Sequence, residues 1–143
     1  MRVVLDTSVL IAGLRSSAGT SAECIRLALV CEIRLLMDYK LSCEYRDVAF
    51  RPHHLLESGK TRDDVTLVLD TLEEVAEPVS VHFVYRPLSP DQSDNLVLDV
   101  AINGNADCIV TVNLKHFVEP AGQFGLRVVT PREFLILMRE RSS

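Results

Sequence analysis

The sequence has no tryptophan, and its other aromatic residues are only three tyrosines and five phenylalanines. It has no apolar run of about 18 residues, the length that a membrane-spanning helix needs, and no C-x-x-C pair among its four cysteines. The chain enters an apolar segment at once, without the ordered parts of a signal peptide. We therefore expect no membrane association and no zinc site. We expect a cytoplasmic protein whose cysteines are small buried hydrophobes.

Positive charge is also scarce in this chain. Lysine and arginine number 15 against 20 aspartates and glutamates, which gives a net charge of −5 at pH 7. This balance argues against an extended basic surface for binding nucleic acid, although a local basic rim is compatible with it. With 143 residues, 48% of them hydrophobic, the chain can bury a sizeable core. We expect a single domain over residues 1–143 and ask where the surplus acids gather.

Short apolar runs alternate with helical patterns along the chain. We expect strands over residues 2–5, 33–37, 79–84, 107–112 and 126–130. We expect helices over residues 7–14, 21–31, 41–50, 61–77, 94–106, 113–117 and 131–141, with residues 51–60 as a connection. Strict alternation of strands and helices favours an α/β fold, here a three-layer α/β/α sandwich around a central, mostly parallel sheet.

Polar and acidic residues recur where the predicted strands end or the next helix begins. They are Asp6, Glu44, Asp94, Thr111 and Asn113, with Asp91 and Asp99 nearby. The carboxyl ends of parallel strands meet at one edge of a sheet, so these groups should converge there. Two unit charges 4 Å apart repel by roughly 4 kcal/mol at an effective dielectric near 20, so the cluster needs raised pKa values or a cation. An all-oxygen set suits Mg²⁺ or Mn²⁺.

Each of these residues also has an ordinary structural alternative. Asp6, Asp94 and Asn113 each stand before a predicted helix and could serve as its N-cap. Glu44 could be a solvated helix residue. The separate signals are weak, and their joint order along the chain is what favours a metal site.

Four segments of the chain resemble the PIN-domain family, in its bacterial toxin type. They are VVLDTSVLIAGL, LSCEYRDV, SDNLVLDVAINGNADCIVTVNLKHF and VVTPREFL. The third is the most specific: an acid, an apolar helix, Ala-Asp, an apolar strand, Thr, any residue, Asp or Asn, and a final His-Phe. The resemblance covers nearly the whole length, so we expect a PIN-like form of the α/β/α sandwich.

The resemblance implies an endoribonuclease that depends on Mg²⁺ or Mn²⁺ and hydrolyses RNA phosphodiester bonds. It places Asp6, Glu44 and Asp94 at the acidic catalytic and metal-binding positions, with Glu44 acting directly or through water. Asn113 stands at a metal-binding position where many relatives have a fourth aspartate. A second ion should therefore bind more weakly. The expected products carry 5′-phosphate and 3′-hydroxyl ends.

The resemblance also implies supporting residues and partners. Thr7, Ser8 and Thr111 would be supporting hydroxyls around the acidic site. Family members of this type often pair with a protein antitoxin and usually dimerise, so RNA, an antitoxin and a homodimer or higher homo-oligomer are the expected partners.

Cations near the acids are needed to hold RNA. The candidates are Arg15, Arg46, Arg51, His53, His54, Lys60, Arg62, Lys115 and His116. We favour Arg46 and Lys115 for RNA contacts because they lie close in sequence to the expected metal ligands.

Two rival enzyme classes are disfavoured by the residues that follow Asp6. A receiver domain needs a second acid at position 7, which is Thr7, and a D-x-D phosphatase needs one at position 8, which is Ser8. The alternative that stays open is a catalytically weak or inactive PIN fold that binds RNA or a partner, and Asn113 favours it.

Overall fold

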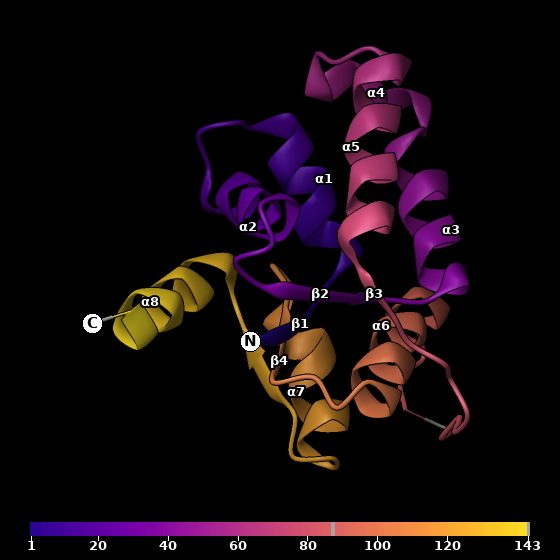
Figure 1. The fold of residues 1–143 in the computed structure, drawn as a ribbon. Helices are drawn as coiled ribbons and strands as arrows, with labels where there is room; N and C mark the ends of the chain where they lie inside the picture. Colours follow the sequence, from indigo (N-terminus) through magenta and orange to yellow (C-terminus); the bar gives the residue numbers. More distant parts are fainter. Residues whose placement is uncertain (87, 143) are drawn as a thin grey trace.

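A computed structural model describes residues 1–86 and 88–142 of the protein (Figure 1). The strands are β1 (Arg2–Leu5), β2 (Arg34–Met37), β3 (Glu77–Pro78), β4 (Cys108–Val110) and β5 (Arg127–Val129). The helices are α1 (Thr7–Arg15), α2 (Thr20–Leu29), α3 (Tyr39–Ala49), α4 (Pro52–Ser58), α5 (Arg62–Val75), α6 (Gln92–Asn103), α7 (Leu114–Gly122) and α8 (Pro131–Ser142).

The strands form one five-stranded sheet in the order β3-β2-β1-β4-β5, and every pair is parallel. The central strand β1 pairs with β2 on one side and with β4 on the other, with Val3 opposite both Leu35 and Cys108. The prediction of a mostly parallel sheet is confirmed. Because all strands run the same way, their carboxyl ends lie along a single edge, where the loops after Leu5, Met37 and Val110 begin.

Helices cover both faces of the sheet, as expected for an α/β/α sandwich. Figure 1 shows α1 to α5 above the sheet and α6 and α7 below it, while α8 lies beside β5. The core consists of fully buried aliphatic side chains from the strands and from the inner helix faces. Helices α1 and α2 cross closely at Gly13, where an added Cβ would lie 2.4 Å from the Cδ1 atom of Ile25.

Residues 51–60 differ from the prediction, because seven of them form helix α4 instead of a connection. Pro52 occupies the first turn and Gly59 ends the helix in a left-handed conformation with φ of 69°. Proline at the start and glycine just after the end are the usual boundaries of a helix, so the signal was present in the sequence.

The segment 79–84 was wrongly predicted as a strand. The edge strand β3 comes earlier and contains only Glu77 and Pro78. Beyond it, the side chain of Asn103 accepts hydrogen bonds from the backbone amides of His82 and Phe83, each at 2.9 Å. A side chain of α6 thus takes the place of a neighbouring strand.

The cysteine prediction is right for two residues and wrong for the other two. Cys24 and Cys108 are buried, whereas Cys31 and Cys43 are exposed, and all four are free thiols. In the described part of the chain, we find no helix with the length and apolar character to cross a membrane.

Candidate active site

Asp6 lies directly after β1, at the carboxyl edge of the sheet, and is 94% buried. It stands at the N-cap position of α1, but its side chain makes no cap hydrogen bond. Its Oδ2 atom instead accepts hydrogen bonds from the Ser8 hydroxyl at 2.5 Å and the Thr111 hydroxyl at 2.8 Å. Burial raises the pKa of Asp6, and these two hydroxyls offset the shift only in part.

Two further residues define the surroundings of Asp6. The phenol of Tyr45, a buried residue of α3, donates a 2.5 Å hydrogen bond to the backbone carbonyl of Leu5 and so ties α3 to the end of β1. The hydroxyl oxygen of Thr7 is buried, and among the described residues it has no hydrogen-bond partner. A buried polar atom without a partner is costly unless a ligand or water satisfies it.

Asp94 lies in the first turn of α6 and lines the same groove as Asp6. The N-cap of this helix is Asp91, whose side chain accepts from the backbone amides of Ser93 and Asp94. The carboxylate of Asp94 is therefore not needed as a cap. Burial, followed by the charges of Asp91 and Asp6, raises the pKa of Asp94 to about 6. The imidazole of His116 lies 3.5 Å from Asp94 Oδ2 and offsets part of this shift.

Glu44 reaches the same groove from α3. Its Oε1 atom accepts a 2.7 Å hydrogen bond from the hydroxyl of Ser93, which immediately precedes Asp94. One side chain thus links the start of α6 to α3. Ser93 was not among the residues singled out from the sequence, although it stands next to Asp94.

Asn113 occupies the N-cap position of α7, also without a side-chain cap bond. Its backbone amide donates to the hydroxyl of Thr111 at 2.9 Å, and the same hydroxyl donates to Asp6. A groove of about 440 Å³ is lined by Asp6, Glu44, Asp94 and Asn113, together with Thr7 and Ser8. The fold therefore brings all four expected metal-binding residues to one groove.

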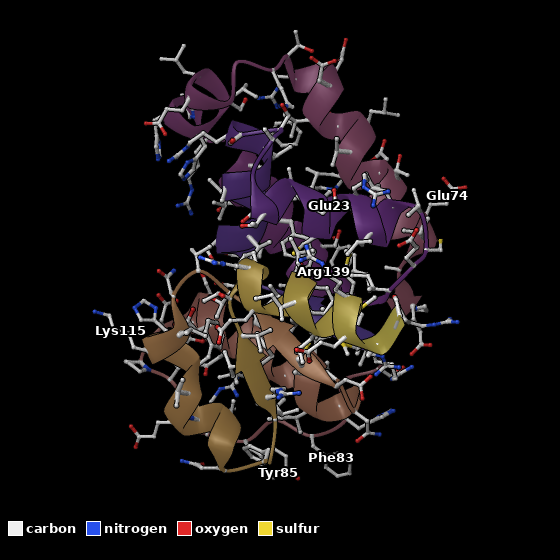
Figure 2. All side chains as sticks on the ribbon, turned by 90° about the vertical axis from the view of Figure 1, so that its left-hand side faces the viewer. Glu23, Glu74, Phe83, Tyr85, Lys115 and Arg139 are labelled. Atoms are coloured by element: carbon white, nitrogen blue, oxygen red, sulfur yellow. The ribbon has the colours of Figure 1, made fainter. Side chains whose placement is uncertain are left out.

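The two basic residues favoured for RNA contacts are placed differently. Lys115 lines an adjoining pocket that also contains Asp94 and His116, and Figure 2 shows it projecting outward from α7. Arg46 does not line the acidic groove. Its guanidinium pairs with Asp70 at 2.7 Å and Glu73 at 2.8 Å on α5, in a separate cavity. The structure therefore does not bring Arg46 together with the acids.

Comparison with protein families identifies the chain. The model of the PIN domain matches residues 2–115, which include Asp6, Glu44, Asp94 and Asn113. The chain belongs to the PIN-domain family. A comparison with curated proteins finds no match. Family members are generally nucleases and typically use divalent metal ions.

This PIN domain's groove has the chemistry of a site for a hard cation. No group of three His, Cys, Asp or Glu side chains within residues 1–86 and 88–142 is spaced to hold a metal ion. Mg²⁺, however, is often held by one or two carboxylates and several waters. Asp6 and Asp94 are two buried carboxyl groups with raised pKa values, and the hydroxyl of Thr7 lacks a partner beside them. These residues fit such an ion.

Proposed function

We propose that this PIN domain is a metal-dependent endoribonuclease that hydrolyses RNA phosphodiester bonds at the groove between β1, α3 and α6. The observation that carries the proposal is the state of Asp6. It is a buried carboxylate that caps no helix and has no lysine or arginine partner within the described residues. Asp94, with its pKa near 6, lines the same groove. A divalent cation would satisfy both carboxylates.

The residues of the chain have distinct roles in this proposal. Asp6 and Asp94 hold the ion, with Glu44 acting directly or through water. Bound Mg²⁺ or Mn²⁺ would activate water and stabilise charge on the phosphate. The hydroxyls of Ser8 and Thr111 fix the orientation of Asp6 by hydrogen bonds to one of its oxygens. Neither of these two hydroxyl bonds uses the other oxygen, Oδ1, which would coordinate the ion.

Glu44 and Asn113 complete the proposed site from opposite sides. The hydroxyl of Ser93 holds Glu44 toward α6 at 2.7 Å. Asn113 offers an amide oxygen in place of a carboxylate, so the groove has three acids at the four family positions. This composition favours one tightly bound ion over two.

The test is cleavage of a mixed RNA panel with Mn²⁺, Mg²⁺ or excess EDTA, comparing the parent with Asp6→Asn. The matched control is Asp38→Asn. Asp38 follows β2 as Asp6 follows β1, but it caps α3 by accepting from the amide of Leu41 at 2.8 Å. We expect cleavage that needs metal, disappears in Asp6→Asn and survives in Asp38→Asn. Cleavage in EDTA at the parental rate would refute the proposal.

Binding without cleavage is the main competing outcome. If no condition yields products but the parent and Asp94→Asn bind RNA equally, the chain is a binding PIN fold and the nuclease proposal fails. Titration calorimetry with Mn²⁺ then shows whether the groove binds an ion at all.

The single-domain organisation, cytoplasmic location and partners are proposals as well. We propose that residues 1–143 form one domain, since β5, beyond the matched family region, pairs with β4.

We propose a protein antitoxin and a homodimer as partners. On α8, Phe134 is buried in the core, whereas Ile136 is 44% exposed and available for such a contact. Light scattering of the purified chain tests the dimer.

A further inference from the structure

The groove that contains the acids continues beyond them, and its far end is basic. Along α1 the lining residues include Thr7, Ile11 and Arg15. Residues four apart lie on one face of a helix, so these three form a single stripe. The stripe begins beside Asp6, passes an aliphatic side chain and ends at an arginine.

The opposite wall repeats this order. Glu44 and Val48 lie four apart on α3, and Arg51 follows at the N-cap of α4. Both walls therefore run from an acid through an aliphatic residue to an arginine. His54 of α4 lines the same basic end. Helix α4 packs against this end of α1, where its Glu57 pairs with Arg15, and Arg51 stands at the N-cap of the same helix.

We propose that Arg15 and Arg51 form a second phosphate subsite, which binds the RNA backbone some nucleotides away from the scissile bond. Thr7 and Arg15 are separated by eight helical residues, or about 12 Å at 1.5 Å per residue. Stacked bases rise about 3.4 Å per nucleotide, so this distance spans roughly three nucleotides. The half-buried side chains of Ile11 and Val48 between the two ends suit a nucleoside. The choice of RNA as ligand rests on the proposed nuclease function.

Arg15 and Arg51 each form an ion pair that an RNA phosphate can replace. Arg15 pairs with Glu57 at 2.5 Å and Arg51 pairs with Asp47 at 3.0 Å, and all four side chains are about half exposed or more. Exposed ion pairs of this kind are weak, whereas arginine binds phosphate through two parallel hydrogen bonds. A phosphate can therefore displace either carboxylate.

His54 contributes differently from the arginines. Burial, followed by the nearby His53 and Arg15, lowers the pKa of His54. This imidazole is therefore harder to protonate than a free one, and its role in the subsite is that of a hydrogen-bonding group. Among the described residues that line the groove, Arg15 and Arg51 are the arginines and lysines that supply the positive charge of this subsite.

The experiment measures RNA binding and cleavage separately for Arg15→Ala, Arg51→Ala and the control Arg26→Ala. Arg26 is matched to Arg51, since it is 52% exposed and pairs with Glu23 on its own helix, α2. Figure 2 shows Glu23 on the face turned to the viewer, whereas Lys115 projects at the left edge of the view. Binding is followed by fluorescence anisotropy of labelled RNA in EDTA, so that it does not depend on cleavage.

We expect Arg15→Ala and Arg51→Ala each to weaken RNA binding on the order of tenfold, as for loss of a charged hydrogen bond. Each should lower the slope of log K against log salt by about 0.7. Arg26→Ala should change neither quantity. Glu57→Gln, which frees Arg15, should strengthen binding.

Substrate length gives the sharper test in the presence of Mn²⁺. Two series of oligonucleotides keep the cleaved bond and grow by one nucleotide at a time on either the 5′ or the 3′ side. KM should become sensitive to Arg15→Ala and Arg51→Ala only in one series, and only beyond about three added nucleotides. The rate at saturating RNA should stay unchanged.

The outcomes separate this inference from the nuclease proposal. Metal-dependent cleavage that is equally insensitive to Arg15→Ala, Arg51→Ala and Arg26→Ala at every length overturns the subsite and leaves the nuclease standing. Binding that depends on Arg15 and Arg51, without cleavage under any condition, overturns the nuclease and keeps the subsite. Equal losses for all three variants indicate a diffuse charge effect and also overturn the subsite.

Discussion

Asp94 and Asp99 lie five residues apart on α6 and are almost equally buried, with side-chain exposures of 11% and 10%. Asp99 receives two 3.0 Å hydrogen bonds from the guanidinium of Arg86. Within the described residues, the nearest basic partner of Asp94 is His116 at 3.5 Å. Asp99 thus forms a complete ion pair, whereas Asp94, in the first turn of the same helix, has only an imidazole beside it among the described residues. This difference, rather than burial or acidity, distinguishes Asp94 as a residue of the proposed ion site.

The same difference separates the groove from the acidic pair Asp70 and Glu73 on α5. Asp70 and Glu73 on α5 lie close together, but Arg46 pairs with both. Both acids are exposed, and each has an arginine partner within the chain. Within residues 1–86 and 88–142, no arginine pairs with Asp6 or Asp94, and this supports the groove as the proposed metal-binding site.

The largest expected difference between Asp94 and Asp99 appears when each is replaced by asparagine. We expect Asp94→Asn to lower the rate of RNA cleavage more than about 100-fold, since losing even an outer partner of a metal ligand typically costs 10- to 100-fold. Asp99→Asn should stay within about threefold of the parent, because Asp99 faces Arg86 and does not line the groove. Initial rates at saturating Mn²⁺ measure both. Equal losses would show that the two carboxylates do not differ in role.

The pH dependence of stability should reveal the unsatisfied carboxylates in metal-free protein. The pKa of Asp94 is about 6 in the folded chain against 3.8 as a free group, so the folded state binds more protons between these values. The free energy of unfolding should therefore fall by about 2 to 3 kcal/mol as pH rises from 4 to 7. Asp6, with its raised pKa, adds in the same direction.

Urea unfolding in EDTA at a series of pH values measures this slope. In Asp94→Asn the fall should be smaller, because the amide does not titrate. Adding Mg²⁺ should stabilise the parent more at pH 7.5 than at pH 5, where protons compete for the carboxylates. A stability that rises with pH over the interval 4 to 6 in the metal-free parent would contradict the assignment.

Removing Arg86 tests the other carboxylate, Asp99, which depends on this arginine as its partner. Arg86→Ala leaves Asp99 buried without its partner, and we expect the free energy of unfolding at pH 7 to fall by about 1 to 2 kcal/mol. Asp99→Asn in the Arg86→Ala background should recover part of the loss, because the amide is neutral. Cleavage should remain at the parental rate. A loss of cleavage in properly folded Arg86→Ala would link the two ends of α6.

The parallel sheet and the convergence of the acids were predictable, because they depend on local patterns. Short apolar strands followed by amphipathic helices favour a parallel sheet, and such a sheet gathers its carboxyl ends at one edge. Asp6, Glu44, Asp94 and Asn113 line one groove for this reason. The sequence could not show which acids have arginine partners, because the Arg46 pair with Glu73 joins residues 27 positions apart.

The errors have physical causes of the same kind. Residues 79–84 have the apolar character of a strand, but the backbone amides of His82 and Phe83 bond to the side chain of Asn103, about 20 residues away. Arg46 stands two residues after Glu44 on α3, and that spacing places them on different faces of the helix. Helix α4 was the avoidable error, since Pro52 and Gly59 mark its ends.

The smallest expected effect is on the affinity for Mn²⁺ when a carboxylate is added at a third position, Asn113. Asn113→Asp adds a carboxylate at the rim of the groove, next to Thr111 and the Asp6 that it contacts. Because residue 113 is exposed, its charge acts through water, and an added attraction of about 1 kcal/mol corresponds to roughly fivefold tighter binding of Mn²⁺. Calorimetry on the parent and the variant measures this, with Asn105→Asp, on the opposite edge of the sheet, as the control. Unchanged affinity in Asn113→Asp would mean that the ion lies between Asp6 and Asp94 alone, whereas appearance of a second binding event would mean that the missing carboxylate had limited this PIN domain to one ion.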